Sequence, residues 1–398
     1  MVAVSTGPPR SRMDPKGLLY RPEVRQVAWQ VALLLALVFA LVWVVQNVAA
    51  NLRRQNIASG FDFLGRVSGF DVSQSLIEYS NLSTYGRAFW VGLLNTLLVA
   101  VLGIVSATVL GFVVGIARLS SNWLIAKLAA AYVEIVRNVP LLLQLFFWYF
   151  AVLKNLPAPR QSYALPGHAY FNVRGLYLPA PVFQPGSEFV LGALVAGIVA
   201  VIALSWWARR RQLLTGQRLP LLWPSLGLLI GLPLVVYLAA GAPVTLDYPE
   251  LAGFNFRGGI AVLPELLALL LGLSVYTASF IAEIVRAGIL GVPKGQTEAA
   301  QALGLSRGQA LRLVIVPQAT RIVIPPLTNQ YLNLTKNSSL AVAIGYPDFV
   351  SVFAGTVLNQ TGQAVEVILM TMGVYLGISL ITSLFMNWFN RRMALVER

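Results

Sequence analysis

The feature that most constrains the fold of this chain is a series of long apolar runs without any charged residue. A helix needs about 20 apolar residues to cross the roughly 30 Å hydrocarbon core of a bilayer. Most of the runs reach about that length, and two are distinctly short. We therefore expect eight membrane spans, which are Gln26–Leu52, Ala88–Ala117, Asn138–Leu153, Phe189–Ala208, Leu219–Leu246, Leu266–Ala282, Ile322–Thr335 and Val367–Asn390.

Composition agrees with a polytopic, all-α membrane bundle. The 398 residues are 57% hydrophobic and 11% charged, whereas a soluble protein carries about 25% charged residues. The net charge of +14 would suggest nucleic acid binding in a soluble protein. Here basic loops that fix topology explain it, so we expect a lipid membrane and no nucleic acid as partner. With no cysteine and one histidine, His168, we expect no metal site.

The distribution of basic residues predicts the topology. With an even number of spans, the side that holds both termini carries 20 Lys and Arg, and the opposite side carries eight. The positive-inside rule therefore places both termini, and the loops near 118–137, 209–218 and 286–321, in the cytoplasm.

These spans predict four parts of the chain. Residues 1–25 form a cytoplasmic tail, 26–87 a first anchor helix with an extracytoplasmic loop, 88–390 the transmembrane domain, and 391–398 a second cytoplasmic tail. Residues 53–87 alternate apolar and polar side chains, as an interfacial helix does. The proline-rich stretch 154–187 is expected to be an ordered outer loop with little regular structure.

The stretch TEAAQALGLSRGQALRLVIVPQA (297–319) reads as a short amphipathic helical hairpin. Pro293 can begin the first helix and Gly304 can end it with a left-handed cap. Ser306 and Gln309 match a capping box at the start of the second helix, which we expect Pro317 to end. The apolar face of this hairpin has to be buried against the bundle, the lipid headgroups or a partner protein.

The residue spacing of this hairpin resembles the EAA loop of ABC-importer membrane subunits. Glu298-Ala299-Ala300 is followed after three residues by Gly304, and after nine more by Val314-Ile315-Val316-Pro317. The resemblance implies a type I ABC-importer permease core whose loop, 291–318, is the coupling helix that docks in a separate ATPase subunit. The implied docking residues are Glu298, Ala299, Ala300, Leu303, Gly304, Ser306 and Pro317.

Three further segments resemble the polar amino-acid importers within that family. They are Arg137–Phe150, Tyr276–Gly288 and Lys336–Leu340. About 110 residues separate the two similar halves, and this insertion near 154–260 resembles the larger permease subunits of general L-amino-acid transporters. The resemblance implies a bacterial inner-membrane permease that forms a heterodimer with a related subunit. It also implies a periplasmic solute-binding protein as partner.

ATP hydrolysis is not expected on this chain. The sequence has no G-x-x-x-x-G-K-[ST] phosphate loop, which is the motif that cradles nucleotide phosphates. We therefore expect no cofactor and no catalytic residue here, and ATP and Mg²⁺ on the partner ATPase.

Charged residues within spans indicate a candidate substrate pathway, because each costs about 2.5–3.5 kcal/mol or more at the bilayer centre. Glu283 near the end of the sixth span is one candidate, although pairing with Arg286 three residues later is the simpler role. Lys336 in the seventh span is another, unless it only extends its amine to the interface. Glu134 and Arg137 are also spaced to pair.

An amino acid is a zwitterion, so its pathway needs hydrogen-bond donors and acceptors. Neutral polar residues in the spans could supply them, or could equally hold helices together at about 0.6 kcal/mol each. The candidates are Asn95, Gln144, Tyr276, Ser279, Asn337 and Ser338.

Two other classes of function remain as alternatives. An ion-coupled secondary transporter would need no ATPase, but it should place acidic residues deep in the spans, where this chain has a lysine. An intramembrane enzyme would need a Ser/His pair, a His cluster or paired carboxylates in the spans, and the sequence contains none of these.

Overall fold

The computed structural model describes residues 22–54, 59–217 and 219–393, so most of the predicted tails lie outside the described residues. Within these ranges seven helices are long and apolar enough to cross a membrane, or eight if one bent pair counts as a span, as the charge-free runs predict. The longest helices are α2 (Pro22–Arg54), α3 (Tyr85–Ala117), α6 (Ser187–Thr215), α9 (Pro264–Leu290), α12 (Val316–Asn337) and α14 (Ala364–Met393).

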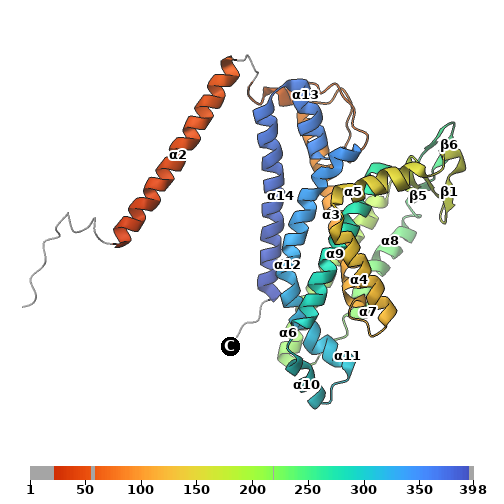
Figure 1. Cartoon of the computed structure of the whole chain (residues 1–398). Helices are drawn as coiled ribbons and strands as arrows, with labels where there is room; N and C mark the ends of the chain where they lie inside the picture. The colour runs from red at the N-terminus through yellow and green to blue at the C-terminus, as the bar shows by residue number, and fades with distance from the viewer. Residues whose placement is uncertain (1–21, 55–58, 218, 394–398) are drawn as a thin grey trace, which may run out of the picture.

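A central bundle is formed by α3, α9, α12 and α14 (Figure 1). Two glycines let α3 approach α9 closely. A Cβ added to Gly111 would lie 2.6 Å from the Cβ of Ile281, and one added to Gly115 would lie 2.8 Å from the carbonyl oxygen of Ala282. Ile281 and Ala282 are completely buried, so small residues on α3 set the helix separation, as is common in membranes.

The prediction of a loop near 118–137 is wrong, because most of this stretch is a helix. The helix α4 (Trp123–Asn138) packs on α9. It is one arm of the bent pair, whose second arm covers Leu141–Asn155 at an angle of 106°. Proline 140 causes the bend: it has no N–H to donate to a helix, and it holds Val139 before it in an extended conformation (φ −98°, ψ 127°).

The second arm replaces the expected short span, and its geometry is irregular. It begins with α5 (Leu141–Phe146), continues as the π-helix η2 (Phe147–Val152) and ends as the 3₁₀ turn η3 (Leu153–Asn155).

Pro317 does not end the second helix of the hairpin, so that prediction is wrong too. The helix α11 (Arg307–Ala310), the π-helix η6 (Leu311–Ile315) and α12 form one continuous span. A π-helical turn widens the backbone directly before Pro317, where the proline has no N–H to donate, and the chain stays helical. The hairpin is therefore the end of a bundle helix and not a separate unit.

The two ends of the bundle are distinct in Figure 1. The helices α10 (Lys294–Ala302) and α11 lie at one end, with the last turn of α14, and we call this the loop end. The short helix α13 (Leu358–Thr361) lies at the other end, and we call that the α13 end.

No long interfacial helix forms between α2 and α3 in the described residues. Residues 59–84 contain a single 3₁₀ turn, η1 (Asp62–Gly65), and an isolated bridge that joins Val67 to Thr84. Their apolar side chains instead pack inward: Phe63 is completely buried in one cluster with Phe349 and with Phe353. Phe353 belongs to the π-helix η8 (Val350–Val357), which Phe349 directly precedes. Aromatic burial at the α13 end thus explains the alternating pattern that suggested an interfacial helix.

The stretch 154–187 contains four strands, so the expectation of an outer loop with little regular structure is wrong. Two of its strands pair with strands that lie beyond α6, so Tyr177 is opposite Ala261 and Phe183 is opposite Val244. Pairing over such a distance cannot be read from local composition. Strands β1 (Tyr163–Leu165), β2 (Ala169–Asn172), β3 (Gly175–Leu178) and β8 (Ile260–Val262) form one sheet. Two further sheets have two strands each: β4 (Ala180–Phe183) with β5 (Val244–Asp247), and β6 (Glu250–Ala252) with β7 (Asn255–Arg257).

Between β4 and β5 the chain forms a helical hairpin, which we call the inserted hairpin. One arm is α6, and the other consists of α7 (Leu222–Leu226), the π-helix η5 (Gly227–Gly231) and α8 (Leu232–Ala239). The arms pack on each other and make no more than isolated contacts with the described helices of the bundle. A Cβ on Gly197 of α6 would lie 2.3 Å from the Leu228 carbonyl oxygen, so this glycine allows the arms to touch.

Candidate functional site

The loop between α9 and α12 has the shape that its sequence predicts. Pro293 precedes the first turn of α10, and Gly304 has a left-handed backbone (φ +76°). The capping box is present: Ser306 N–H donates to Gln309 Oε1 at 3.0 Å, and Gln309 N–H donates to Ser306 Oγ at 3.4 Å. These local bonds hold the two short helices of the loop 291–318 as one rigid unit, which we call the knuckle.

The side chains of the knuckle divide into an inner and an outer set. Ala300 and Ala310 are each 3% exposed and face the chain itself, whereas Leu303 is 82% exposed at the corner. Glu298, Ala299 and Ser306 are exposed as well, and so is Pro317. The outer set can contact another protein, and the inner alanines act by holding the corner together.

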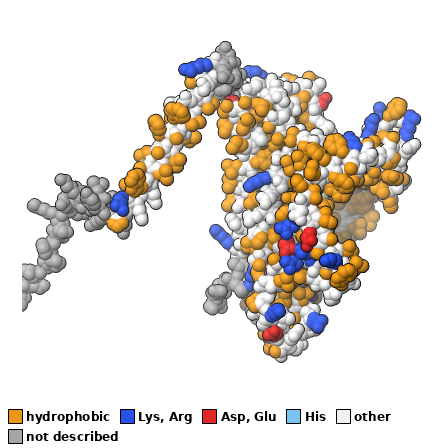
Figure 2. Space-filling model, in the orientation of Figure 1, with side chains coloured by type: hydrophobic (Ala, Val, Ile, Leu, Met, Phe, Trp, Pro, Cys, Tyr) orange, Lys and Arg blue, Asp and Glu red, His pale blue; other side chains and the backbone are white. Residues whose placement is uncertain are grey.

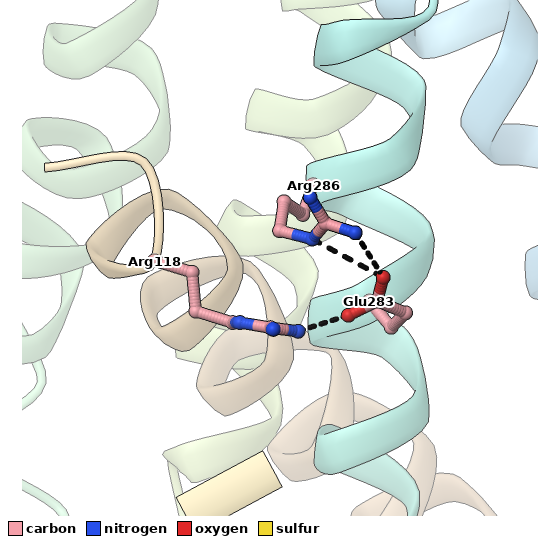
Figure 3. A network of polar contacts seen from close by, with 3 residues as sticks. All are labelled: Arg118, Glu283 and Arg286. Atoms are coloured by element: carbon pink, nitrogen blue, oxygen red, sulfur yellow. Dashed lines mark hydrogen bonds and ion pairs between the residues drawn. The ribbon is translucent and has the colours of Figure 1, made fainter. Parts of the chain in front are cut away.

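An apolar cluster and an ion-pair network anchor the knuckle to the bundle. Val292, Ile315 and Ala319 pack together where α9 and α12 approach the loop. Two turns earlier on α9, Glu283 accepts hydrogen bonds from Arg286 Nη2 at 2.5 Å and Nε at 3.1 Å, and an ion pair joins it to Arg118 (Figure 3). The Glu283–Arg286 pairing is confirmed, and Arg118 extends it to the end of α3.

Four of the neutral candidates are buried, and the first three, Asn95, Gln144 and Ser279, serve the fold. Asn95 of α3 donates from Nδ2 to the carbonyl oxygens of Gln74 and Pro347 at 2.8 and 2.9 Å. Gln144 donates to the carbonyl oxygens of Val136 and Val139, both at 2.9 Å, and so caps the end of α4 at the bend. Ser279 is completely buried and donates to the Tyr276 carbonyl oxygen at 2.6 Å.

The other candidates lie in two separate places. Tyr276 is half-buried on α9, with its ring 5.0 Å from that of Phe280. Ser338 is completely buried and donates to the Thr335 carbonyl oxygen at 2.7 Å, beside the half-buried Asn337. The structure therefore does not gather the predicted pathway residues into one site.

Lys336 is exposed, and no described residue pairs with its amine. Its neighbour Leu334 packs against Gly103, near the midpoint of α3, where an added Cβ would lie 3.1 Å from Leu334 Cδ2. The lysine lies in the last turn of α12 but is thus close to the level of the midpoint of α3. It lines a cavity of about 440 Å³ with Ser339, Thr371 and Tyr375.

Sequence reasoning missed the buried carboxylate of Asp348. It is 0% exposed and accepts hydrogen bonds from the Ser351 backbone N–H at 2.8 Å and from Tyr375 Oη at 3.0 Å. The only signal was its position directly after Gly345-Tyr-Pro347, which is where a helix can be capped. Asp348 caps the helix that begins at Phe349 and ties α14 to it.

The prediction that Glu134 and Arg137 pair is wrong. They form no ion pair, and the Arg137 guanidinium lies over the Phe280 ring with its Cζ 4.9 Å from the ring centroid. The attraction of a cation to an aromatic face competes here with a nearby carboxylate.

Comparison with known proteins gives consistent relatives over nearly the whole chain. Residues 107–395 match the family described as "Binding-protein-dependent transport system inner membrane component". The general L-amino acid transport system permease protein AapQ of Rhizobium johnstonii is 56% identical over 383 residues, which cover 96% of this chain and 96% of that protein. The putative amino-acid ABC transporter permease protein YhdX of Escherichia coli K12 is 56% identical over 378 residues, covering 95% and 96%.

A third relative is more distant but spans both chains completely. The glutamate/glutamine/aspartate/asparagine transport system permease protein BztB of Rhodobacter capsulatus is 41% identical over 428 aligned residues, which cover 100% of each. The similarity therefore includes the inserted hairpin and the strands beside it.

Proposed function

This chain belongs to the family of binding-protein-dependent transport system inner membrane components, and on that premise we propose that it imports L-amino acids as the permease subunit of an ATP-driven transporter. The names of relatives that are 56% identical over nearly the whole chain support amino acids as the substrate class. The ion-coupled alternative has no observation in its favour.

We infer that the knuckle is where a separate ATPase subunit docks, with ATP and Mg²⁺ bound on that partner. The observation that carries this proposal is the exposed Leu303 on a corner fixed by a capping box and by buried alanines. A rigid, exposed apolar corner can transmit a push to α9 and α12 as a rigid body. Both termini would then lie on the cytoplasmic side with the knuckle, and a periplasmic binding protein would deliver substrate at the α13 end.

The Lys336 cavity supports a pathway between this chain and a second, related permease. A lysine at the level of the midpoint of α3 that no described residue pairs costs about 2.5–3.5 kcal/mol or more in lipid. A neighbouring permease subunit that keeps the cavity wet removes this cost, and the amine can then attract the carboxylate of a passing amino acid. We propose this face, between α12 and α14, as the side on which the heterodimer forms.

The substitution Leu303→Asp tests the docking proposal. It should leave the yield of folded permease unchanged, because the side chain is 82% exposed, and it should abolish co-purification of the ATPase subunit and uptake of labelled amino acid. The matched control is Leu213→Asp, a leucine of α6 that is 86% exposed and should retain both. Retained assembly and uptake in Leu303→Asp would refute docking at this corner, whereas a charge at the buried Ala300 would disturb the knuckle itself.

A further inference from the structure

A second cavity, of about 460 Å³, lies between α3, α4 and α9 toward the loop end. Its lining is charged, and it consists of Arg118, Val133, Glu134, Arg137, Asn138, Phe280 and Glu283. Side chains of both signs adjoin at the place where α4 and α9 meet, on a face that is otherwise mostly hydrophobic (Figure 2). The volume falls within the range of about 300–1,000 Å³ of small-molecule sites.

The charges in this cavity are only partly neutralised by the protein. Glu283 is satisfied by Arg118 and Arg286. The Glu134 carboxylate, in contrast, has no hydrogen bond or ion pair with any described residue, although Arg137 is one helical turn away. Arg137 is held over Phe280 instead, so a carboxylate and a guanidinium both remain open to the cavity.

Asn138 and Arg118 add further hydrogen-bonding groups to the cavity. Asn138 donates its Nδ2 to the Glu134 backbone oxygen at 2.7 Å, which leaves its Oδ1 as an acceptor in the cavity that both residues line. Arg118 contacts Glu283 through Nη1, and its other nitrogens have no partner among the described residues. Glu134 and Asn138 thus offer acceptors to the cavity, and Arg118 and Arg137 offer donors.

Separate donors and acceptors at a spacing of one helical turn suit a small zwitterion. A carboxylate can accept a bidentate pair of bonds from Arg137, and an α-ammonium group can donate to Glu134 and to Asn138 Oδ1. Phe280 already carries Arg137 on its face and gives the cavity an apolar wall. Glu134 and Arg137 are both exposed and so accessible to a ligand, and such a ligand would neutralise both charges.

We propose that this cavity is a loop-end binding site for a free α-amino acid, held by Arg137 at its carboxylate and by Glu134 at its ammonium group. The inference rests on the proposed function, since the loop end is then the side on which imported amino acid is released. A bound amino acid would join α4 to the Glu283 network, two turns from the knuckle, and so could report the internal amino-acid level to the ATPase docking loop.

Calorimetric titration of the complete transporter tests this site. The complex, without its binding protein and in phosphatidylcholine nanodiscs, is titrated with L-alanine and with L-glutamate, and then with N-acetyl-L-alanine and L-alaninamide. We expect the two free amino acids to bind and the two blocked derivatives, which each lack one charge, to fail. Glu134→Gln and Arg137→Gln should each weaken binding about tenfold or more. Lys127→Gln, which removes a charge from α4 outside the cavity, should not.

The outcomes separate this inference from the proposed function. Absence of amino-acid binding, or equal binding by the Glu134 and Arg137 variants, overturns the site while uptake by the same preparation still supports the importer. A thermal shift produced by phosphatidylethanolamine, lost in the two variants and not reproduced by amino acids, would assign the cavity to a zwitterionic lipid headgroup and also overturn the inference. Failure of uptake in the wild-type complex with its binding protein would instead count against the proposed function.

Discussion

The helices α3 and α9 and the two arms of the inserted hairpin come from equally charge-free runs, yet they pack differently. The pair α3 and α9 buries side chains along its whole length. In the inserted hairpin, only Gly197 and Ala208 of α6 are buried, and the second arm buries none of its described side chains. In lipid, apolar surface alone does not drive helices together, so packing depends on small residues and polar contacts.

The bundle has both small residues and polar contacts at its helix interfaces, whereas the inserted hairpin has only the small residues. Gly111 and Gly115 bring α3 onto α9, and the ion pair from Arg118 to Glu283 joins their ends. Gly197 brings the hairpin arms together, but no ion pair joins the described residues of the hairpin to the bundle. The bundle is therefore expected to carry the stability of the subunit, and the hairpin to present its surface to lipid or to another chain.

The substitution Gly115→Leu in the bundle should lower the stability of the subunit the most. Its Cβ would lie 2.8 Å from the Ala282 oxygen and from Val285 Cβ, so the two helices must separate, at a cost of about 3 kcal/mol. The thermal unfolding midpoint of the purified subunit measures this cost. Gly192→Leu on α6, where a Cβ meets nothing within 4 Å, is the control and should leave the midpoint unchanged. Equal decreases of the unfolding midpoint in the two variants would show that the bundle and the inserted hairpin do not differ in how tightly they pack.

Removal of the Glu283 carboxylate should have the second largest effect. Glu283→Ala leaves Arg118 and Arg286 without their acceptor, and we expect a loss of about 2 kcal/mol in unfolding free energy. Glu188→Ala at the start of α6 should cost far less, because that carboxylate accepts only a 3.4 Å bond from the Gly186 N–H. Denaturant titration of both variants measures the two losses in unfolding free energy. A larger loss for Glu188→Ala would show that polar contacts do not distinguish the bundle from the inserted hairpin.

Deletion of the inserted hairpin should have the smallest effect on the bundle. Phe183 and Val244 are the last pair of β4 and β5, so an Asn-Gly turn can replace residues 184–243 and join the two strands directly. We expect the unfolding free energy of the bundle to change by about 0.5 kcal/mol or less. Thermal unfolding of the shortened subunit tests this, and a loss as large as that of Gly115→Leu would mean that the hairpin braces the bundle.

Local sequence signals predicted local structure well. The turn at Gly304, the capping box at Ser306 and the pairing of Glu283 with Arg286 depend on residues within a few positions of each other, and all three are confirmed. The expected helix end at Pro317 failed because a π-helical turn upstream accommodates the proline, and composition gives no sign of such a turn.

The candidate site was predicted only in part, because its contacts cross long distances in sequence. Arg118 reaches Glu283 over 165 residues. Arg137 leaves its neighbour Glu134 for Phe280 on another helix. Spacing along the chain predicts which residues can meet within one helix, but it does not predict which of several partners an arginine takes.

The sequence by itself determined that this is a helical membrane protein with a knuckle of EAA type, because hydrophobic length and turn chemistry are properties of short stretches. Only the tertiary structure decided which apolar helices pack together, that strands before α6 pair with strands after α8, and that Glu134 and Arg137 stay apart in one cavity. These outcomes depend on contacts between distant segments, where the close approach allowed by one glycine or the choice of one aromatic ring outweighs local preference.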